Sequence, residues 1–154
     1  MTQTPRIRRI DPAAPAAQAC LAAYYAELGR RFARGFDVSL SRDPEAAAML
    51  PPRGVFLIAE AAGAPLGCVG VKGGRDYAEI KRLWVSPDAR GMGLARRLMA
   101  AAEAEARGLG IAALRLDTNS LLPEAVALYR ATGWAEIARF NDDPYPDFFF
   151  EKRL

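Results

Sequence analysis

The middle of the chain constrains the fold most, because three short apolar runs lead at once into a glycine-bearing loop and a helix. Glycine turns separate the runs, which we expect to be strands at residues 55–61, 66–71 and 77–85. Two consecutive hairpins give an antiparallel meander. The helix expected at residues 94–107 then leads to a fourth run at residues 111–117. A helical crossover makes that strand parallel to residues 77–85.

Periodic apolar positions predict further elements on both sides of this centre. Helices are expected at residues 11–32, 44–50 and 123–132, and Gly35, Pro51-Pro52 and Gly133 end them. Leu94, Leu98, Ala102 and Leu109 mark the buried side of the helix at 94–107. Strands are also expected at 6–10, 134–140 and 148–152. The predicted order is β-α-α-β-β-β-α-β-α-β-β. This is an α/β fold with a mixed, mostly antiparallel twisted sheet and helices on both faces, and residues 1–154 form one domain.

The composition excludes several kinds of chemistry. Hydrophobic residues make up 51% and charged residues 25%, as in globular proteins. The absence of histidine removes histidine triads, histidine metal sites and imidazole acid–base chemistry, so we expect no metal. Proton transfer must use Glu, Asp, Tyr, Lys, Cys or water. We interpret Cys20 and Cys68 as two buried thiols in a reducing compartment.

Charge and hydropathy point away from nucleic acids and membranes. The formal net charge is +3, and the arginines are scattered without a long basic run. No apolar run approaches the roughly 20 residues that cross a bilayer, and the N-terminus has no signal-like apolar stretch. We therefore expect a cytoplasmic protein that binds neither nucleic acid nor membrane, and mild basicity suits a small polyanionic ligand.

The most informative segment is a strand that enters a glycine turn and then a helix: Val85-Ser86-Pro87-Asp88-Ala89-Arg90-Gly91-Met92-Gly93-Leu94-Ala95. A helix N-terminus offers unpaired N–H groups and the positive end of a dipole. Gly91 and Gly93 remove side chains that would keep an anion from the backbone. Leu94-Ala95 does not fit the Walker pattern, and Arg96 stands at the last glycine of the dinucleotide fingerprint. These residues predict a phosphate or pyrophosphate cradle, with a plain helix-capping turn as the alternative.

Two spaced motifs then resemble a known family. Arg90 to Ala95 matches the pattern Arg/Gln-x-x-Gly-x-Gly/Ala of the GNAT superfamily of N-acetyltransferases. A second block, Asn119 followed by Tyr129-Arg130-Ala131-Thr132-Gly133-Trp134, is similar to the second acyl-CoA segment of that family. The predicted element order also resembles the family along nearly the whole chain.

The resemblance implies acetyl-CoA as cosubstrate and gives each motif a role. The amides of Arg90, Gly91, Met92, Gly93, Leu94 and Ala95 would hold the pyrophosphate. The backbone around Leu83, Trp84 and Val85 would pair with the pantetheine arm, inserted where strands 77–85 and 111–117 splay apart. Further contacts would come from Arg96, Asn119, Ala125, Leu128 and Tyr129. The alternatives are a solvated charge for Arg96 and a loop cap for Asn119.

The resemblance also implies direct attack of an amine on the thioester. Tyr129 is the candidate general acid for the leaving thiolate, and a backbone N–H near Val85 would stabilise the oxyanion. Glu79 is the candidate general base. The alternatives are a core aromatic for Tyr129, and for Glu79 an ion pair with Lys81 or Arg82.

The acceptor is less constrained. By family position Tyr24 and Tyr25 are pocket walls, Asp142 and Asp143 could hold a cationic amine, and Arg82 could hold a carboxylate instead. The alternative for the two aspartates is turn chemistry in a Pro-rich loop.

The hypothesis is thus an acyl-CoA-dependent N-acyltransferase that acetylates a primary amine of a small molecule or peptide. Two other hypotheses stay open, a non-catalytic acyl-CoA sensing module of the same fold and a small-ligand nucleotide binder. Members of the family often form homodimers, and nothing in the sequence decides that point.

Overall fold

A computed structural model describes residues 4–32 and 47–154, and in this part of the chain seven strands form one sheet in the order β1-β2-β3-β4-β5-β7-β6. The strands are β1 Arg6–Arg9, β2 Val55–Ala61, β3 Ala64–Lys72, β4 Ala78–Val85, β5 Ala113–Thr118, β6 Ala135–Glu136 and β7 Phe148–Arg153. The helices are α1 Pro15–Arg31, α2 Leu94–Gly108 and α3 Pro123–Ala131, with a short 3₁₀ turn η2 at Pro87–Ala89.

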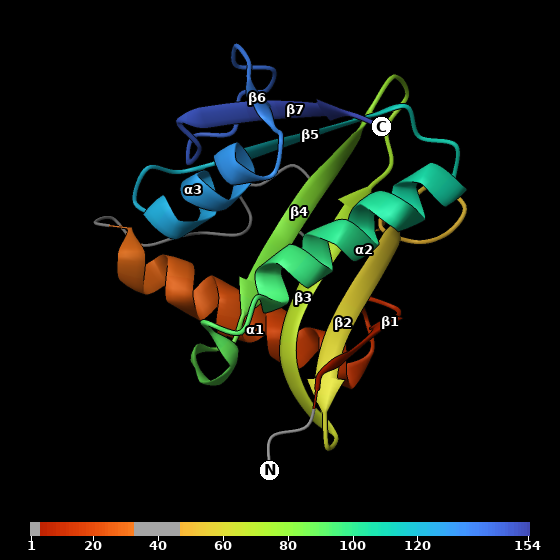
Figure 1. Cartoon of the computed structure of the whole chain (residues 1–154), viewed down its shortest axis with the longest axis vertical. Helices are drawn as coiled ribbons and strands as arrows, with labels where there is room; N and C mark the ends of the chain where they lie inside the picture. The colour runs from red at the N-terminus through yellow and green to blue at the C-terminus, as the bar shows by residue number, and fades with distance from the viewer. Residues whose placement is uncertain (1–3, 33–46) are drawn as a thin grey trace.

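The sheet is split between β4 and β5. Strands β2, β3 and β4 form the predicted antiparallel meander, and β4 and β5 are parallel as the crossover required. The parallel pair is short, because only Ala78 with Leu114 and Glu79 with Arg115 are in register. Figure 1 shows β4 and β5 running apart from this common end. The sheet therefore opens toward the carboxyl ends of both strands.

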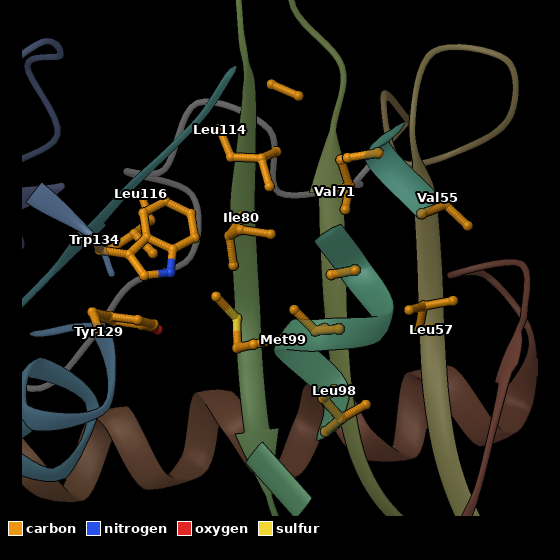
Figure 2. Close-up of a cluster of buried hydrophobic side chains, with 14 of the residues drawn as sticks. Val55, Leu57, Val71, Ile80, Leu98, Met99, Leu114, Leu116, Tyr129 and Trp134 are labelled. Atoms are coloured by element: carbon orange, nitrogen blue, oxygen red, sulfur yellow. The ribbon is translucent and has the colours of Figure 1, made fainter. Parts of the chain in front are cut away.

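Separate hydrophobic clusters cover the two faces of the sheet, as the helix pattern predicted. On one face Leu98 and Met99 of α2 pack over the strands, with Tyr129 and Trp134 beside them (Figure 2). On the other face α1 contributes Cys20 and neighbouring apolar residues. Each large side chain buried in this way stabilises the fold by about 1.5–3 kcal/mol. The two clusters hold α1 and α2 on opposite sides of β4 (Figure 1).

One predicted strand is much shorter than expected. Residues 134–140 were expected to be extended, but only Ala135–Glu136 pairs with β7, followed by one bond from the Ile137 N–H to the Phe149 carbonyl at 2.8 Å. The reason lies in Arg139, whose guanidinium donates to the backbone carbonyls of Asn141, Asp143 and Pro146. These bonds take the chain away from the sheet edge and into a loop.

Smaller corrections concern helix ends and two predicted features. The first helix begins at Pro15, because the Asp11 carboxylate accepts from the Ala13 N–H and holds a turn there. Leu109 is only half-buried because it caps α2, and Ala106 is buried on that side instead. Gly35, the expected end of the first helix, lies outside the described residues. So do residues 44–46 of the helix expected at 44–50, and residues 47–50 form turns and bends.

Two expectations about the interior and the bilayer can be compared with the structure. Cys20 and Cys68 are free thiols and both are buried, as predicted. Within residues 4–32 and 47–154, none of the helices has the length and apolar character needed to cross a bilayer.

Candidate active site

Two joined cavities occupy the opening between β4 and α3. The large cavity, of about 540 Å³, lies at the N-terminus of α2, and the small cavity, of about 120 Å³, lies toward the last loop. Residues from α1, β4 and the start of α3 line both cavities: Tyr24, Leu28, Leu83, Leu122 and Ala125. The two cavities are therefore neighbours along these residues.

The glycine loop and the N-terminus of α2 form one end of the large cavity. Gly93 caps α2 with φ 75°, and Gly91 has φ 83°, a region that disfavours side chains. A Cβ at either glycine would meet no atom within 4 Å, so the space in front of them is open. In the described chain no side chain caps this helix, and its first N–H groups stay available to an anion.

Most residues predicted for the coenzyme line the large cavity. They are Leu83, Trp84, Val85, Arg90, Gly91, Gly93, Leu94, Ala95, Arg96, Ala125 and Leu128. Met92 is not one of the described residues that line either cavity, and it is 48% exposed. Asn119 and Tyr129 line the small cavity instead. The motif residues are thus brought together as the resemblance implied, while their roles stay predictions.

Ion pairs that the sequence did not indicate lie at the edge of the large cavity. The Arg90 Nε donates to the Val85 carbonyl at 3.1 Å, and its guanidinium pairs with Glu27 of α1. Glu27 also lies 3.3 Å from Arg31, and Arg31 pairs with Glu124 of α3. Glu27 and Glu124 both line the cavity, so this charged network joins α1, α3 and the glycine loop.

A bulge in β4 lies where the two cavities meet. Between the pairs Cys68–Trp84 and Gly70–Lys81, two residues of β4 oppose one of β3, and Arg82 takes φ 57°. Side chains hold this strained conformation: the Arg82 Nε donates to the Tyr25 hydroxyl, and the Cys68 thiol donates to the Arg82 carbonyl at 3.3 Å. The next residue, Leu83, lines both cavities.

Two phenols reach the small cavity from opposite sides. Tyr24 comes from α1 and Tyr129 from α3. Burial raises the pKa of both hydroxyls, and the Asp117 carboxylate adds to the effect at Tyr129. Tyr129 packs edge-on against Trp134, with ring centroids 6.1 Å apart. Both phenols are therefore protonated at neutral pH, as a proton donor must be.

Glu79, the predicted base, faces a lysine instead of a cavity. Its carboxylate lies 3.4 Å from the Lys81 Nζ, and Glu79 is not among the described residues that line either cavity. The Lys81 Nζ lies 3.7 Å from Asp117, and the Asn141 amide donates to that carboxylate at 2.7 Å. Lys81 and Asp117 do line the small cavity; the sequence indicated Lys81 only as a possible ion-pair partner of Glu79 and did not indicate Asp117. A polar residue near the carboxyl end of β5, one of the two parallel strands, was the available signal for Asp117.

The acceptor candidates divide in the structure. Tyr24, Tyr25, Arg82 and Asp143 line the small cavity, whereas Asp142 is exposed and is not one of its described lining residues. The Asp143 carboxylate accepts from the Tyr145 N–H at 3.1 Å, a bond typical of an Asx turn.

Asn119 is also held by its own loop. Its amide donates to the Tyr145 carbonyl and accepts from the Leu121 N–H at 2.8 Å. In this conformation both ends of the side chain are engaged, as the loop-cap alternative requires.

Comparison with known proteins decides the family. Residues 21–134 match the model of the acetyltransferase (GNAT) family. The chain belongs to the GNAT family. A relative from Azospirillum brasilense named "IAA acetyltransferase" is 41% identical over 107 residues, which cover 64% of this chain and 67% of that protein.

Solved structures agree with this assignment. An acyl-CoA N-acyltransferase structure from Klebsiella pneumoniae covers 97% of each chain at 28% identity, with a TM-score of 0.77. A GNAT acetyltransferase from Elizabethkingia anophelis with acetyl-CoA bound shares the fold at 16% identity and a TM-score of 0.71, covering 97% of this chain and 98% of that one. The fold expected from the sequence is thus confirmed, and an acyl-CoA-dependent N-acetyltransferase activity follows from the family.

Proposed function

We propose that this protein transfers an acetyl group from acetyl-CoA to a primary amine of a small molecule. The observation that carries the proposal is the junction of the two cavities. The large one presents an uncapped helix N-terminus behind two glycines, and the small one holds a buried phenol and charged side chains. A long anionic donor and a small polar acceptor can meet at Leu83, which lines both.

The residues of the large cavity fit coenzyme A. Open space in front of Gly91 and Gly93 admits a pyrophosphate to the backbone, and the free N–H groups of α2 complement its charge. The divergence of β4 and β5 leaves backbone of β4 for the pantetheine arm around Leu83 and Val85. When bound, the coenzyme supplies an acetyl thioester. The structure of the Elizabethkingia anophelis relative with acetyl-CoA supports this cosubstrate.

Transfer forms a C–N bond, breaks a C–S bond and moves two protons. Tyr129 would give its proton to the leaving thiolate, because it lines the small cavity and burial keeps it protonated. The nitrogen of the attacking ammonium loses two protons: one before attack, and a second after the C–N bond has formed, which would restore the Tyr129 phenol. Glu79 would take the first proton through a water molecule, since its carboxylate does not line either cavity within the described chain. An N–H of β4 near Val85 would stabilise the oxyanion.

A thiol-release screen tests the proposal. Purified protein with acetyl-CoA is offered polyamines, aminoglycosides, amino acids, lysine peptides and IAA, after which the Azospirillum brasilense relative is named. We expect release of free CoA with at least one amine and an acetamide product by mass spectrometry.

The screen also separates the enzyme from the sensing module. Binding of acetyl-CoA without release for any acceptor would favour the sensor. Competition of ATP or NAD with CoA would favour a nucleotide binder.

A further inference from the structure

Asp117 is the carboxylate that the small cavity presents where β4 and β5 part. It follows Arg115, the last residue of β5 in register with β4, by two positions. Its side chain is 13% exposed, and it lines the cavity together with Tyr24 and Tyr129. A cation in this cavity would meet the carboxylate away from most of the solvent, where charge pairing is stronger than at the surface.

The surroundings of Asp117 are of mixed charge, because Lys72, Lys81 and Arg82 line the same cavity, and the Arg82 Nε donates to the Tyr25 hydroxyl. Its nearest basic group, the Lys81 Nζ at 3.7 Å, is shared with Glu79 at 3.4 Å, so these three side chains together carry one negative charge. The Asn141 amide donates to Asp117 Oδ2 and fixes the direction of the carboxylate. Both contacts use Oδ2, and among the described residues no hydrogen bond reaches Oδ1.

The position of Asp117 relative to the phenols places it near the junction of the cavities. Its charge contributes to the raised pKa of Tyr129, after burial, and is a smaller cause at Tyr24. Asp117, Tyr24 and Tyr129 also line the same small cavity. Tyr24 lines both cavities, and Tyr129 is the proposed donor to the thiolate. An ammonium held by Asp117 would lie beside the group that serves the leaving sulfur.

We propose that Asp117 binds the ammonium group of the acceptor and makes the small cavity selective for cationic amines. This inference rests on the proposed function and gives its acceptor a chemical class. It also gives Lys81 a role, because the lysine competes with the acceptor for the same carboxylate. Replacing Asp117 and replacing Lys81, each in a separate variant, should then change the affinity for the amine in opposite directions.

Two variants test the inference by calorimetry on the full chain saturated with CoA. The probes are propylammonium, spermidine and lysinamide, with the neutral arylamine aniline as a control. Asp117→Asn should lower the affinity for the cationic probe that binds tightest to the wild type about ten- to a hundredfold. Lys81→Gln should raise the affinity for the same probe about threefold. Neither variant should change the affinity for CoA or for aniline.

The outcomes decide the inference separately from the proposed function. A structural role for the ion pair predicts that both variants move amine affinity in the same direction, and that result overturns the inference. So does a wild type that binds none of the three cations. If Asp117→Asn does not fold, Lys81→Gln still decides, because unchanged or weaker amine binding contradicts competition. Cation binding that depends on Asp117, without thiol release for any amine, would keep the subsite and remove the proposed activity.

Discussion

The two cavities of this GNAT protein share five lining residues and differ in the remainder. At one end of the large cavity, Gly91, Gly93 and the first turn of α2 present backbone to the cavity. The small cavity is made of side chains from α1, β3, β4, β5, α3 and the last loop, such as Tyr24, Asp117 and Tyr129. A backbone site needs only a few residues that permit one conformation. A side-chain site depends on where several distant elements place their ends.

This difference predicts how each cavity responds to mutation. At the large cavity, a side chain that fills the space in front of the backbone should reduce acetyl-CoA binding far more than the loss of a charged side chain. At the small cavity, the loss of a single polar atom should change kcat or the KM for the amine.

The largest effect is expected at Gly93. Gly93→Val puts a side chain into the open space before the helix N-terminus, so acetyl-CoA should no longer bind. At a ligand concentration of 100 Kd the wild type gains about 2.7 kcal/mol, seen as a higher Tm, and the variant should gain none.

Gly110→Val is the matched control for this variant. Gly110 has φ 79° and open space around it, but it follows the other end of α2. Both variants carry the cost of a side chain in the left-handed region, about 1–2 kcal/mol. Equal stabilisation of the two variants by acetyl-CoA would remove the pyrophosphate assignment.

Tyr129→Phe should have the next largest effect, and on kcat instead of binding. The change removes one oxygen and keeps the ring beside Trp134, so stability should change by about 1 kcal/mol. If the phenol protonates the thiolate, kcat should fall roughly 10- to 1000-fold while the KM for acetyl-CoA is nearly constant. A donor with a more acidic leaving thiol should recover part of the rate.

The pH profile of the wild type gives a second check on Tyr129. Because its pKa is raised, the phenol keeps its proton above the ordinary tyrosine pKa of about 10. The rate should therefore not decline as pH rises toward that value. A wild-type rate in Tyr129→Phe, or a loss confined to KM, would leave Tyr129 as a packing or binding residue.

The contrast between the cavities also explains what the sequence could predict. Gly91 and Gly93 could be assigned because a strand, a glycine turn and a helix dictate their backbone. The meander and the parallel crossover followed from turns and helix length. Asp117 could not be found in the same way, because its place in a cavity depends on where β5 separates from β4. That separation is a matter of how distant strands pair, which no local pattern records.

Loop side chains show the same limit. For Asn119 the sequence left a pantetheine contact and a loop cap open; its amide bonds to the Tyr145 carbonyl and the Leu121 N–H, and the pantetheine contact stays a prediction. Residues 134–140 had the pattern of a strand, but Arg139 bonds to loop carbonyls and shortens it. In both cases a polar side chain bonds to backbone carbonyls of the last loop, whose position depends on tertiary contacts and not on the local sequence.

A smaller effect is expected for the acidic pair in that loop. Replacing Asp142 and Asp143 with Asn should raise the KM for a cationic amine about fivefold, through loss of negative charge at the cavity edge. The KM for acetyl-CoA should be unchanged. The effect is modest because Asp142 is exposed and Asp143 already bonds to the Tyr145 N–H. An unchanged KM for the amine would give the pair a turn-forming role only.

The smallest effect is expected at Arg96, and it tests whether backbone dominates the large cavity. Arg96→Gln removes a charge that lines the cavity, so the KM for acetyl-CoA should rise about two- to fivefold at low salt. The effect should fade as salt rises, since exposed charges are screened over about 10 Å at 0.1 M. The neighbouring Arg97 donates to the Pro5 carbonyl and is not one of the described lining residues, so Arg97→Gln is the control and should leave this KM unchanged. A loss of a hundredfold or more in Arg96→Gln would contradict the comparison, because a side chain would then hold the coenzyme that the glycines and the helix N-terminus are proposed to hold.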